Sequence, residues 1–459
     1  MKFKAGKRRG GLAGTAGATL RLAALLLVAA ALAGCMRASL APEIDGERTE
    51  NGDVGKYAVE LEYWHTYSDL EQEVFLAKVL PLFEKQYPHI RVNAVRKDYT
   101  DQFKDTLLFA VADNKQPDVM RMDIVWVPEF AKKEALAELS GMPGFKAIKD
   151  TFIGSLIQTN MYKGGYYGLP VNANTRAAIY NKTLLREAGL TEPPTTFEEL
   201  EAAAERLRAS KPEAYGIGVC CSNGWGMLPY FWTLGGELTD PQYTKASGYL
   251  NGEGSRAALS RMKDWLDRGI VSRSVLGEVP GTWDGILKGQ LMMIDDAHWF
   301  HTVNATGPNK ELLDDVVIGL FPGSGQAGGQ GAAAADADGK AATGTSVIGG
   351  ENLVLFEQSE HKQEAWEFIR WMTSEEPQRI MAETGLIPTI QGLENSVPNP
   401  IFKPYLEQLK RAKPRPPVPN WTAIDEEFAR MVERIMAGEL TVEAATDQAA
   451  VQIDGLLRD

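Results

Sequence analysis

The sequence predicts an α/β protein built from two lobes, and three observations support this. The chain has 459 residues, which is more than a single hydrophobic core usually organises. Short apolar stretches with strand-like alternation are separated by amphipathic stretches of helical length, a pattern typical of sheets covered by helices. Hydrophobic residues make up 44% of the chain and charged residues 24%, which is ordinary for a globular protein.

The first elements alternate strand and helix three times. Residues 57–64 (YAVELEYW) alternate with period two, which predicts a strand. Ser68 and Glu71 have the spacing of a capping box and predict the start of a helix. The same reasoning places the next strands at 89–95 and 117–123, and helices at 101–112 and 127–139.

The later elements continue the alternation, which indicates a mainly parallel sheet. Residues 166–190 (YYGLPVNANTRAAIYNKTLLREAGL) predict two strands and a helix, with amides and an arginine between the strands. Thr195 and Thr196 each precede a glutamate by three residues, which predicts a helix at 197–210. Further strands are expected at 214–220, 315–322 and 346–356, and helices at 254–269, 361–385, 424–437 and 441–457. Glycine and alanine dominate 323–344, which predicts a mobile loop.

The N-terminus has the features of an export signal. A basic segment precedes twelve apolar residues from Leu22 to Ala33, too few for a membrane-spanning helix, which needs about 20. The LAGC that ends at Cys35 resembles the lipobox of bacterial lipoproteins, which implies cleavage after residue 34 and acylation of Cys35; an ordinary secretory signal is the alternative. Polar residues 36–56 predict a flexible tether.

The charge of the chain argues against nucleic acid as a partner. Six of the 48 basic residues lie in the first 34 positions, where there is no acidic residue, so the remainder has 42 basic and 61 acidic residues. Such a surface repels polyanions.

Several stretches together resemble the bacterial extracellular solute-binding proteins of ABC importers, within the carbohydrate-binding branch that includes the maltose-binding proteins. The most specific are YGLPV…IYNKTLL and LKGQLMMIDDAHW, and the resemblance covers nearly all of 57–459. It implies a two-lobed periplasmic-binding-protein-like fold of type II, in which the chain crosses between the lobes several times. The implied lobes are 57–170 with 346–388, and 171–345 with 389–459.

The resemblance also implies a function. The protein is expected to be a monomeric, extracytoplasmic receptor without cofactor or bound metal, anchored to the cell membrane by its lipid. It would bind a carbohydrate in the cleft between the lobes and deliver it to the permease of an ABC importer, without enzymatic activity.

Candidate ligand contacts follow from the chemistry of sugars. Hydroxyl groups need paired acceptors and donors, and the faces of sugar rings stack on aromatic side chains. Such residues are expected where strands end. The candidates are Trp64, His65, Tyr67, Asp123, Asn174, Arg176, Trp225, Trp283, Asp284, Asp296, Trp299 and Glu351. For Asn172 and Trp232 a structural role is equally expected.

The sequence alone is also compatible with two other functions. A receptor for a peptide or polyamine has the same fold, and a secreted glycosidase is a third possibility. His298 and His301 stand near two aspartates, but their spacing fits no standard metal site. Cys220 and Cys221 are adjacent and form either a disulfide between neighbours or two thiols.

Overall fold

The structure is a computed structural model that describes residues 58–100, 102–324, 343–393 and 396–458. The predicted signal peptide (1–34), the predicted acylation site Cys35 and the predicted tether (36–56) lie outside these residues, as does most of the predicted loop at 323–344. None of the helices among the described residues is both long and apolar enough to cross a membrane.

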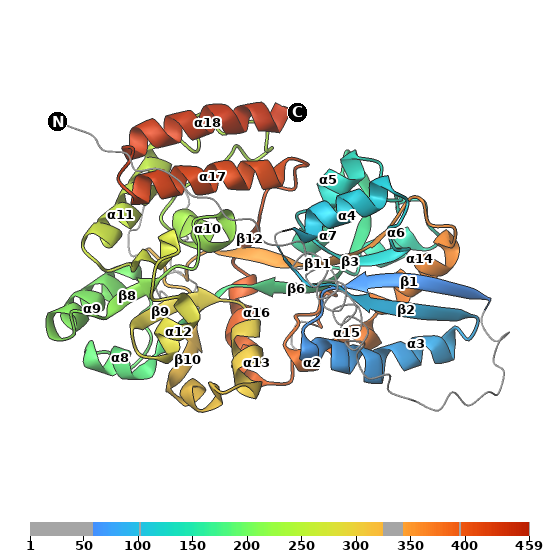
Figure 1. The fold of residues 1–459 in the computed structure, drawn as a ribbon, viewed down its shortest axis with the longest axis horizontal. Helices are drawn as coiled ribbons and strands as arrows, with labels where there is room; N and C mark the ends of the chain where they lie inside the picture. Colours follow the sequence, from blue (N-terminus) through green and yellow to red (C-terminus); the bar gives the residue numbers. More distant parts are fainter. Residues whose placement is uncertain (1–57, 101, 325–342, 394–395, 459) are drawn as a thin grey trace, which may run out of the picture. The chain divides into compact units, whose positions relative to one another are not determined.

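One sheet has six strands, and it carries most of the N-terminal elements (Figure 1). Its order is β12-β11-β3-β1-β2, with β6 also paired to β11. β1 is parallel to β2 and β3, whereas β11 is antiparallel to β3 and β6. The strands are β1 (Val59–His65), β2 (Ile90–Arg96), β3 (Val119–Asp123), β6 (Gly168–Thr175), β11 (Ser346–Leu355) and β12 (Ala412–Pro414).

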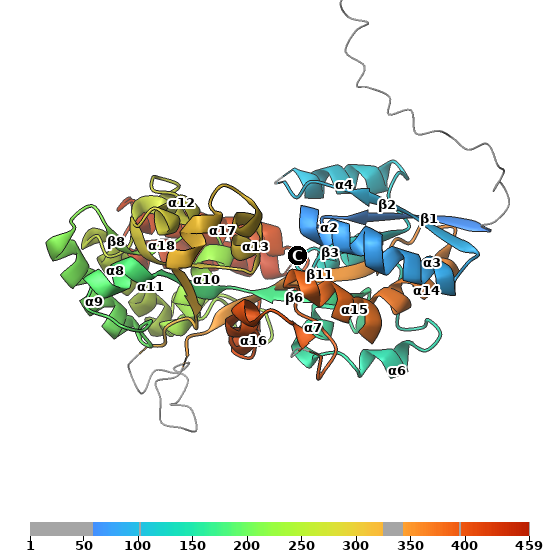
Figure 2. The same cartoon turned by 90° about the horizontal axis from the view of Figure 1, so that it is seen from below.

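Helices cover both faces of this sheet because side chains alternate along its strands. Leu61 and Tyr63 of β1 pack against α3 and α14, and Trp64 packs on the opposite face against α4. Figure 2 shows α4 on one side of the strands and α14 on the other. The helices of this first half are α2 (Asp69–Val74), α3 (Leu80–Gln86), α4 (Phe103–Ala112), α5 (Val127–Lys132), α6 (Phe145–Lys149), α7 (Gly154–Ile157), α14 (Lys362–Met372) and α15 (Glu375–Met381).

A second sheet has four strands in the order β10-β7-β9-β8 and forms the second half, and a two-stranded sheet pairs β4 (Met161–Tyr162) with β5 (Gly165–Tyr166). β7 is antiparallel to β9 and β10, and β8 is parallel to β9. The strands are β7 (Ala177–Asn181), β8 (Tyr215–Gly218), β9 (Leu291–Asp296) and β10 (Val316–Gly319). Its helices are α8 (Lys182–Glu187), α9 (Phe197–Ser210), α10 (Gly224–Thr233), α11 (Glu253–Asp267), α12 (Thr282–Leu287) and α13 (Trp299–Thr306).

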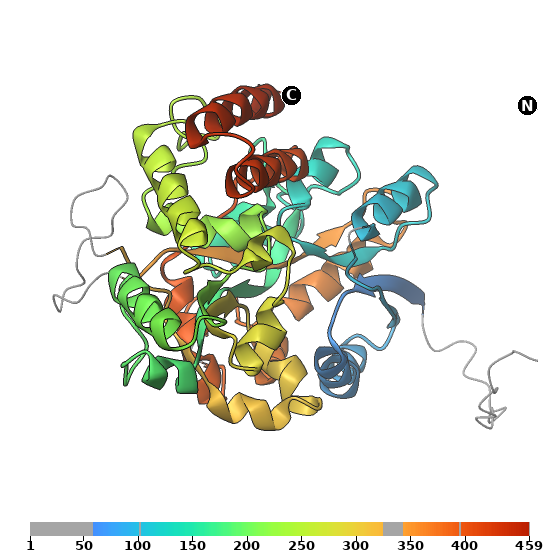
Figure 3. The same cartoon turned by 60° about the vertical axis from the view of Figure 1, so that its left-hand side comes forward.

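The C-terminal segment contributes to both halves. After α16 (Lys403–Leu409), β12 joins the six-stranded sheet. The last helices, α17 (Trp421–Met436) and α18 (Val442–Arg458), pack with α10 and α11 in the large apolar core of the second half. They are the red helices beside the yellow-green α11 in Figures 1 and 3.

The capping signals read from the sequence are confirmed. Ser68 and Glu71 form the full capping box of α2. Thr196 accepts a hydrogen bond from the Glu199 amide at the start of α9, which spans the predicted residues. Gly438, with φ of 75°, separates the last two helices as expected.

Two expectations about the fold were wrong. The sheets are mixed rather than mainly parallel, because β6 and β11 run in opposite directions and pair along most of their length. The helix expected at 127–139 ends at Lys132, since Glu134 adopts a positive φ of 56° and Leu136 forms a bridge with Phe356.

Candidate functional site

The candidate site lies where the chain passes from the six-stranded sheet to the four-stranded one. β6 is hydrogen-bonded to β11, and β7 begins two residues after β6 ends, so that Arg176 alone joins them. Arg176 is buried, as are Asn172 and Asn174 before it. The polar residues that interrupt this apolar stretch therefore stand at the junction of the two sheets. The sequence predicted amides between two strands, whereas Asn172 and Asn174 lie inside β6 and only Arg176 stands between β6 and β7.

Arg121, in the middle of β3, is held by three side chains from other parts of the chain. Its Nε donates to Asn172 Oδ1 at 3.1 Å, its Nη1 to Thr66 Oγ1 at 3.0 Å and its Nη2 to Glu351 Oε2 at 2.7 Å. Asn172 Nδ2 also donates to Glu351 Oε2, at 2.6 Å. Burial raises the pKa of Glu351, while the charge of Arg121 and the hydrogen bond from Asn172 act against that rise. This network fixes polar groups among β3, β6 and β11 of the six-stranded sheet.

Arg176 is held on the other side of the junction by a single carboxylate. Its Nε donates to Asp295 Oδ2 at 2.5 Å and its Nη2 to the Asp295 carbonyl, while the Tyr230 hydroxyl donates to Asp295 Oδ1 at 2.9 Å. The Arg176 and Asp295 side chains are 1% and 0% exposed. Burial alone would lower the pKa of Arg176, but Asp295 raises it well above its usual range. The guanidinium therefore stays charged and fixed.

Two tryptophans stack beside Arg176. The rings of Trp225, at the start of α10, and Trp299, at the start of α13, have centroids 5.9 Å apart and an interplanar angle of 27°. The guanidinium carbons of Arg176 and Arg415 lie 5.3 and 5.4 Å from the Trp225 ring centroid. Both rings are only partly buried. They offer flat aromatic surface of the kind that packs on a sugar ring.

Two buried polar atoms beside this stack have no partner among the described residues. They are Asn174 Oδ1, an acceptor, and Arg415 Nε, a donor. Asn174 Oδ1 faces Gly349, where an added Cβ would come within 2.2 Å of it. A buried unpaired donor or acceptor costs about 1–3 kcal/mol. A hydroxyl group, which both donates and accepts, is suited to such a pair of atoms.

Asp123, at the end of β3, lies next to Arg415. A nitrogen of Arg415 is 3.7 Å from Asp123 Oδ1, and the Tyr99 hydroxyl donates to Asp123 Oδ2 at 2.8 Å. The Tyr99 ring stacks on Trp126 with centroids 5.6 Å apart and an angle of 5°. Tyr99 is 59% exposed, so it forms the outer rim of the cluster.

Side-chain contacts connect the two halves around this cluster. Glu71 of α2 lies 3.5 Å from His298 Nε2, next to α13, and Lys104 of α4 donates to Thr422 of α17 at 2.8 Å. Burial alone would raise the pKa of Glu71, but the hydrogen bond from His298 and the charge of Arg121 lower it to about 2. Glu71 is therefore an anion at neutral pH, held against the second half.

Three predicted site residues at the end of β1 and just after it point into the first half. Trp64 belongs to the core beneath α4, with Lys97 Nζ 3.8 Å from its ring centroid. His65 and Tyr67 are buried, with ring centroids 4.8 Å apart and the rings tilted by 37°. Burial and the nearby charge of Arg121 lower the pKa of His65 to about 3, so its ring is neutral. Tyr67 reaches the cluster only through Arg121, 4.6 Å from its ring.

Three other predicted residues lie apart from the tryptophan stack. Trp283 packs edge-on against Phe300 and donates from Nε1 to Asp296 Oδ2 at 2.5 Å. Asp296 is buried, and its burial raises its pKa above the usual range. Asp284 is exposed and paired with Lys288 one turn along α12. The structure thus groups Arg176, Trp225, Trp299 and Asn174 with Asp123 and Glu351. Trp283 and Asp284 make their contacts elsewhere, whereas the charge of Asp296 helps to raise the pKa of Arg176.

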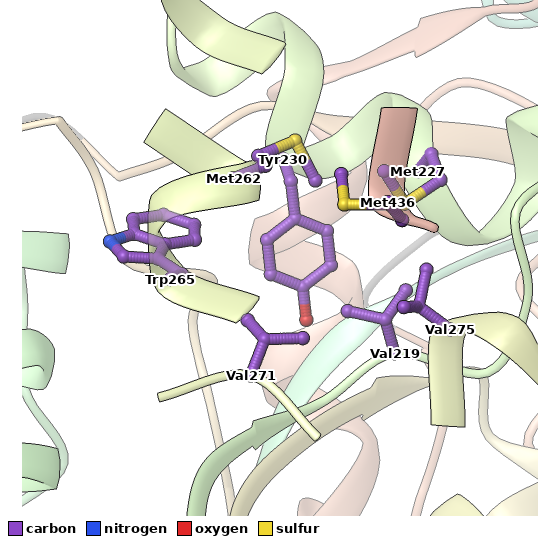
Figure 4. Close-up of a pocket in the computed structure, with 8 residues that line it drawn as sticks. All are labelled: Val219, Met227, Tyr230, Met262, Trp265, Val271, Val275 and Met436. Atoms are coloured by element: carbon purple, nitrogen blue, oxygen red, sulfur yellow. The ribbon is translucent and has the colours of Figure 1, made fainter. Parts of the chain in front are cut away.

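The hollows found in the described part of the chain lie elsewhere. A cavity of about 10 Å³ lies in the apolar core of the second half, where Figure 4 shows the Tyr230 ring between Trp265 and Val219. An open polar hollow of about 540 Å³ is lined by Glu60, Glu62 and Asp118 at the start of β1 and β3. Neither of these two hollows contains a predicted ligand-binding residue. No group of three or more metal-ligating side chains occurs among the described residues.

Sequence reasoning missed Arg121, Arg415 and Tyr99. Arg121 had a visible signal, since it interrupts the apolar strand VMRMD and an arginine there needs a partner. Arg415 lies in the extended stretch KPRPPVPNW, which gives no indication of what it contacts. Tyr99 lies outside any predicted element. All three depend on contacts between distant parts of the chain.

Comparison with known proteins identifies the family. The family described as bacterial extracellular solute-binding proteins matches residues 67–379. The chain belongs to this family. Its members are binding receptors, which agrees with the prediction that the protein is not an enzyme.

Individual relatives agree with this membership. A binding protein of Brucella abortus (strain 2308) is 23% identical over 393 residues, which cover 84% of this chain and 90% of the relative. The maltotriose-binding protein of Pyrococcus abyssi is 22% identical over 386 residues, covering 82% of this chain and 77% of that protein.

Solved structures of similar proteins confirm the predicted two-lobed α/β fold of type II. The GacH receptor of Streptomyces glaucescens superposes with a TM-score of 0.73 at 22% identity, covering 88% of this chain and all of that chain. The sugar-binding protein MalE of Xanthomonas citri gives a TM-score of 0.71 at 25% identity, covering 87% of this chain and 97% of its own.

Proposed function

We propose that this solute-binding protein captures a neutral carbohydrate between its two halves and delivers it to the permease of an ABC importer. The observation that carries the proposal is the Trp225–Trp299 stack beside the unpaired Asn174 Oδ1 and Arg415 Nε. Aromatic faces next to a separate donor and acceptor match a sugar, which has apolar ring faces and hydroxyl groups at its rim.

The charges of the cluster favour a neutral ligand over a peptide or polyamine. Arg121 is paired with Glu351, Arg176 with Asp295, and Arg415 lies near Asp123. Each of these arginines is therefore paired with a carboxylate that the protein itself supplies. A polyamine would need unpaired carboxylates, and a peptide would need groups for its charged termini.

The names of relatives point the same way. Besides the maltotriose-binding protein, the chain resembles a diacetylchitobiose-binding protein of Streptomyces coelicolor, 22% identical over 344 residues. The GacH structures include a complex with acarbose. These ligands are oligosaccharides, and the proposal extends that class to this chain without specifying the sugar.

Ligand entry requires the halves to separate. The Glu71–His298 and Lys104–Thr422 contacts would break in an open form, exposing the tryptophans. A sugar that touches both halves binds the closed form more tightly and shifts the population towards it. We assign the lobes of this motion to 57–170 with 346–388, and to 171–345 with 389–459. β12 is then a strand that the second lobe contributes to the six-stranded sheet.

We further propose that Cys35 is acylated after removal of residues 1–34, so that the receptor is an extracytoplasmic monomer held at the cell membrane by its lipid. The LAGC sequence supports this assignment. Metabolic labelling with a palmitate analogue tests it, with Cys35→Ser as the control, which should remain unlabelled.

A ligand panel tests the carbohydrate proposal. The purified protein is heated with maltose, maltotriose, diacetylchitobiose, spermidine or a tripeptide, and unfolding is followed by fluorescence. A ligand at 100 times its Kd stabilises the folded state by about 2.7 kcal/mol, which raises the melting temperature. Stabilisation by a sugar without release of reducing ends supports the proposal. A shift with spermidine or the tripeptide alone contradicts it.

Variants of two tryptophans locate the site. Trp299→Ala should weaken sugar binding by more than about thirtyfold, the loss expected for a central aromatic contact, and leave the protein folded. Trp283→Ala is the matched control, because Trp283 packs on Phe300 away from the stack. Equal loss of affinity in both variants, measured by calorimetry, contradicts the assignment.

A further inference from the structure

The adjacent cysteines lie directly behind the tryptophan stack, at a point that the binding function does not account for. β8 ends at Gly218, and the chain then turns so that the sulfur atoms of Cys220 and Cys221 lie 2.7 Å apart. Successive side chains of an extended strand point to opposite faces, so the sulfurs meet only because the strand has ended. Both residues are free cysteines and only partly buried.

Each sulfur contacts a residue that positions the binding site. Arg176 Nη2 is 3.5 Å from Cys220 Sγ, and Cys221 Sγ is 3.2 Å from Asn223 Oδ1. Asn223 also caps α10 through the amide of Gly226. These contacts connect the thiols to the guanidinium beside the Trp225 ring and to the turn of helix that carries Trp225.

The thiols also pack against the bare backbone of Gly226, next to Trp225. A Cβ added at Gly226 would lie 2.8 Å from Cys221 Sγ and 3.2 Å from Cys220 Sγ. A change in bonding between the sulfurs therefore takes place in direct contact with the first turn of α10.

We propose that Cys220 and Cys221 are a redox modification site, which forms a reversible disulfide between neighbouring residues and thereby changes how tightly the receptor binds its ligand. The effect on binding rests on the proposed function, whereas the thiol chemistry does not. Arg176 favours the thiolate of Cys220, and the hydrogen bond with Cys221 also lowers the Cys220 pKa.

The reaction is thiol–disulfide exchange with a small-molecule disulfide. The Cys220 thiolate attacks one sulfur of the oxidant, which releases one thiolate and leaves a mixed disulfide. Cys221 then loses its proton to water and attacks the Cys220 sulfur, which releases the second thiolate. The protein loses two electrons and two protons, and the oxidant is reduced to two thiols.

The product should be easily reduced. The Cα atoms of neighbouring residues are about 3.8 Å apart, closer than the roughly 4.4–6.8 Å usual in disulfides. Strained disulfides have higher reduction potentials, so mild thiols reverse the bond.

The test uses the full chain with Cys35→Ser, so that only the pair can react. After treatment with oxidised glutathione, the number of titratable thiols should fall from two to zero and the chain should remain monomeric. Dithiothreitol should restore both thiols. Cys221→Ser should instead retain one glutathione on Cys220 in a mixed disulfide, seen by mass spectrometry, whereas Cys220→Ser lacks the attacking thiolate and should react more slowly. Persistence of both thiols in the folded, oxidant-treated chain overturns the proposal.

The effect of the disulfide on the binding site is measured separately, by tryptophan fluorescence and by the Kd for sugar. Oxidation should change tryptophan fluorescence and alter the Kd for the best sugar of the panel by at least about fivefold, the lower range of coupling between linked sites. The double variants Cys220→Ser/Cys221→Ser and Cys220→Ala/Cys221→Ala should show neither response to oxidant. A disulfide that leaves fluorescence and Kd unchanged overturns the link. If no sugar binds in either state, the proposed function fails, while the thiol and fluorescence results still decide the modification.

Discussion

The two buried arginines on either side of the sheet junction are anchored in different ways. Arg121 shares its three nitrogens among Asn172, Thr66 and Glu351, and the Glu351 side chain is 16% exposed. Arg176 is hydrogen-bonded to the carboxylate of Asp295, and both side chains are sealed from solvent. We propose that the distributed anchor, whose Glu351 is partly exposed, exchanges partners with a ligand, whereas the sealed anchor belongs to the scaffold.

This difference suggests two roles for charged residues near the binding site, one in stability and one in affinity. A sealed ion pair is costly to break because each charge would be left without solvent. A partly exposed network tolerates changes at one member because other hydrogen bonds and water remain. We therefore expect the Arg176 pair to control stability and the Arg121 network to control affinity.

The largest expected effect is on the sealed pair. Asp295→Ala removes the carboxylate that is hydrogen-bonded to the buried Arg176 and should lower the free energy of unfolding by about 3–5 kcal/mol. Urea unfolding measures this. Glu351→Ala is the matched variant, because it removes the carboxylate from the other arginine, and it should cost clearly less. Equal losses would erase the distinction between the two anchors.

The next effect is a pH dependence on the Arg121 side. Burial and the charge of Arg121 lower the His65 pKa from 6.5 to about 3. Between these values the unfolded chain binds a proton that the folded protein does not, so acidification favours unfolding. This group should contribute up to about 1.4 kcal/mol of lost stability per pH unit as the pH falls from 6.5 towards 3.

Comparison of variants isolates that contribution, since other groups also titrate in this range. The stability of His65→Asn should fall less steeply with acidification than that of the wild type. His89→Asn, at a half-exposed histidine, is the control and should follow the wild-type curve. Parallel curves for all three proteins would show that His65 is not held neutral.

A smaller effect on stability, with a larger one on binding, is expected at Glu351. Glu351→Gln keeps the shape of the side chain but weakens the charge-assisted bond to Arg121, which should cost about 1–2 kcal/mol of stability at most. Affinity for the sugar should fall about tenfold or more if Glu351 accepts a ligand hydroxyl. Unchanged affinity, measured by calorimetry, would place Glu351 in the scaffold with Asp295.

The smallest effect is expected at Asp284, which the sequence placed in the site. Its carboxylate lies at the surface beside Lys288, and exposed pairs contribute little. Asp284→Asn should change the free energy of unfolding by less than about 0.5 kcal/mol and leave sugar affinity unaltered. A clear loss of affinity would require Asp284 to approach the ligand in another conformation.

The sequence predicted those features of the fold that depend on interactions between residues close together in the chain. The capping residues Ser68 and Thr196 set helix starts within a few residues, and Arg176 lies where β6 is followed by β7. Strand ends were less informative, because position alone does not say which face a side chain occupies. Trp64 ends a strand like a site residue, yet its ring points into the core beneath α4.

The remaining contacts could not be predicted because they depend on the register of distant strands. Glu351 lies opposite both Asp123 and Asn172 only because β11 pairs with β3 on one side and β6 on the other. Arg415 reaches Trp225 across nearly two hundred positions of sequence. Neither composition nor periodicity contains this information.

Because a single residue joins β6 to β7, insertions and deletions at this point should not be tolerated. Ala178 and Tyr180 point into the large core of the second half, while Ala177 and Ile179 face other clusters. Inserting one amino acid after Thr175 would turn β7 over and exchange these two sets. Surface loops can lengthen or shorten during divergence, but this short connection should tolerate neither insertion nor deletion.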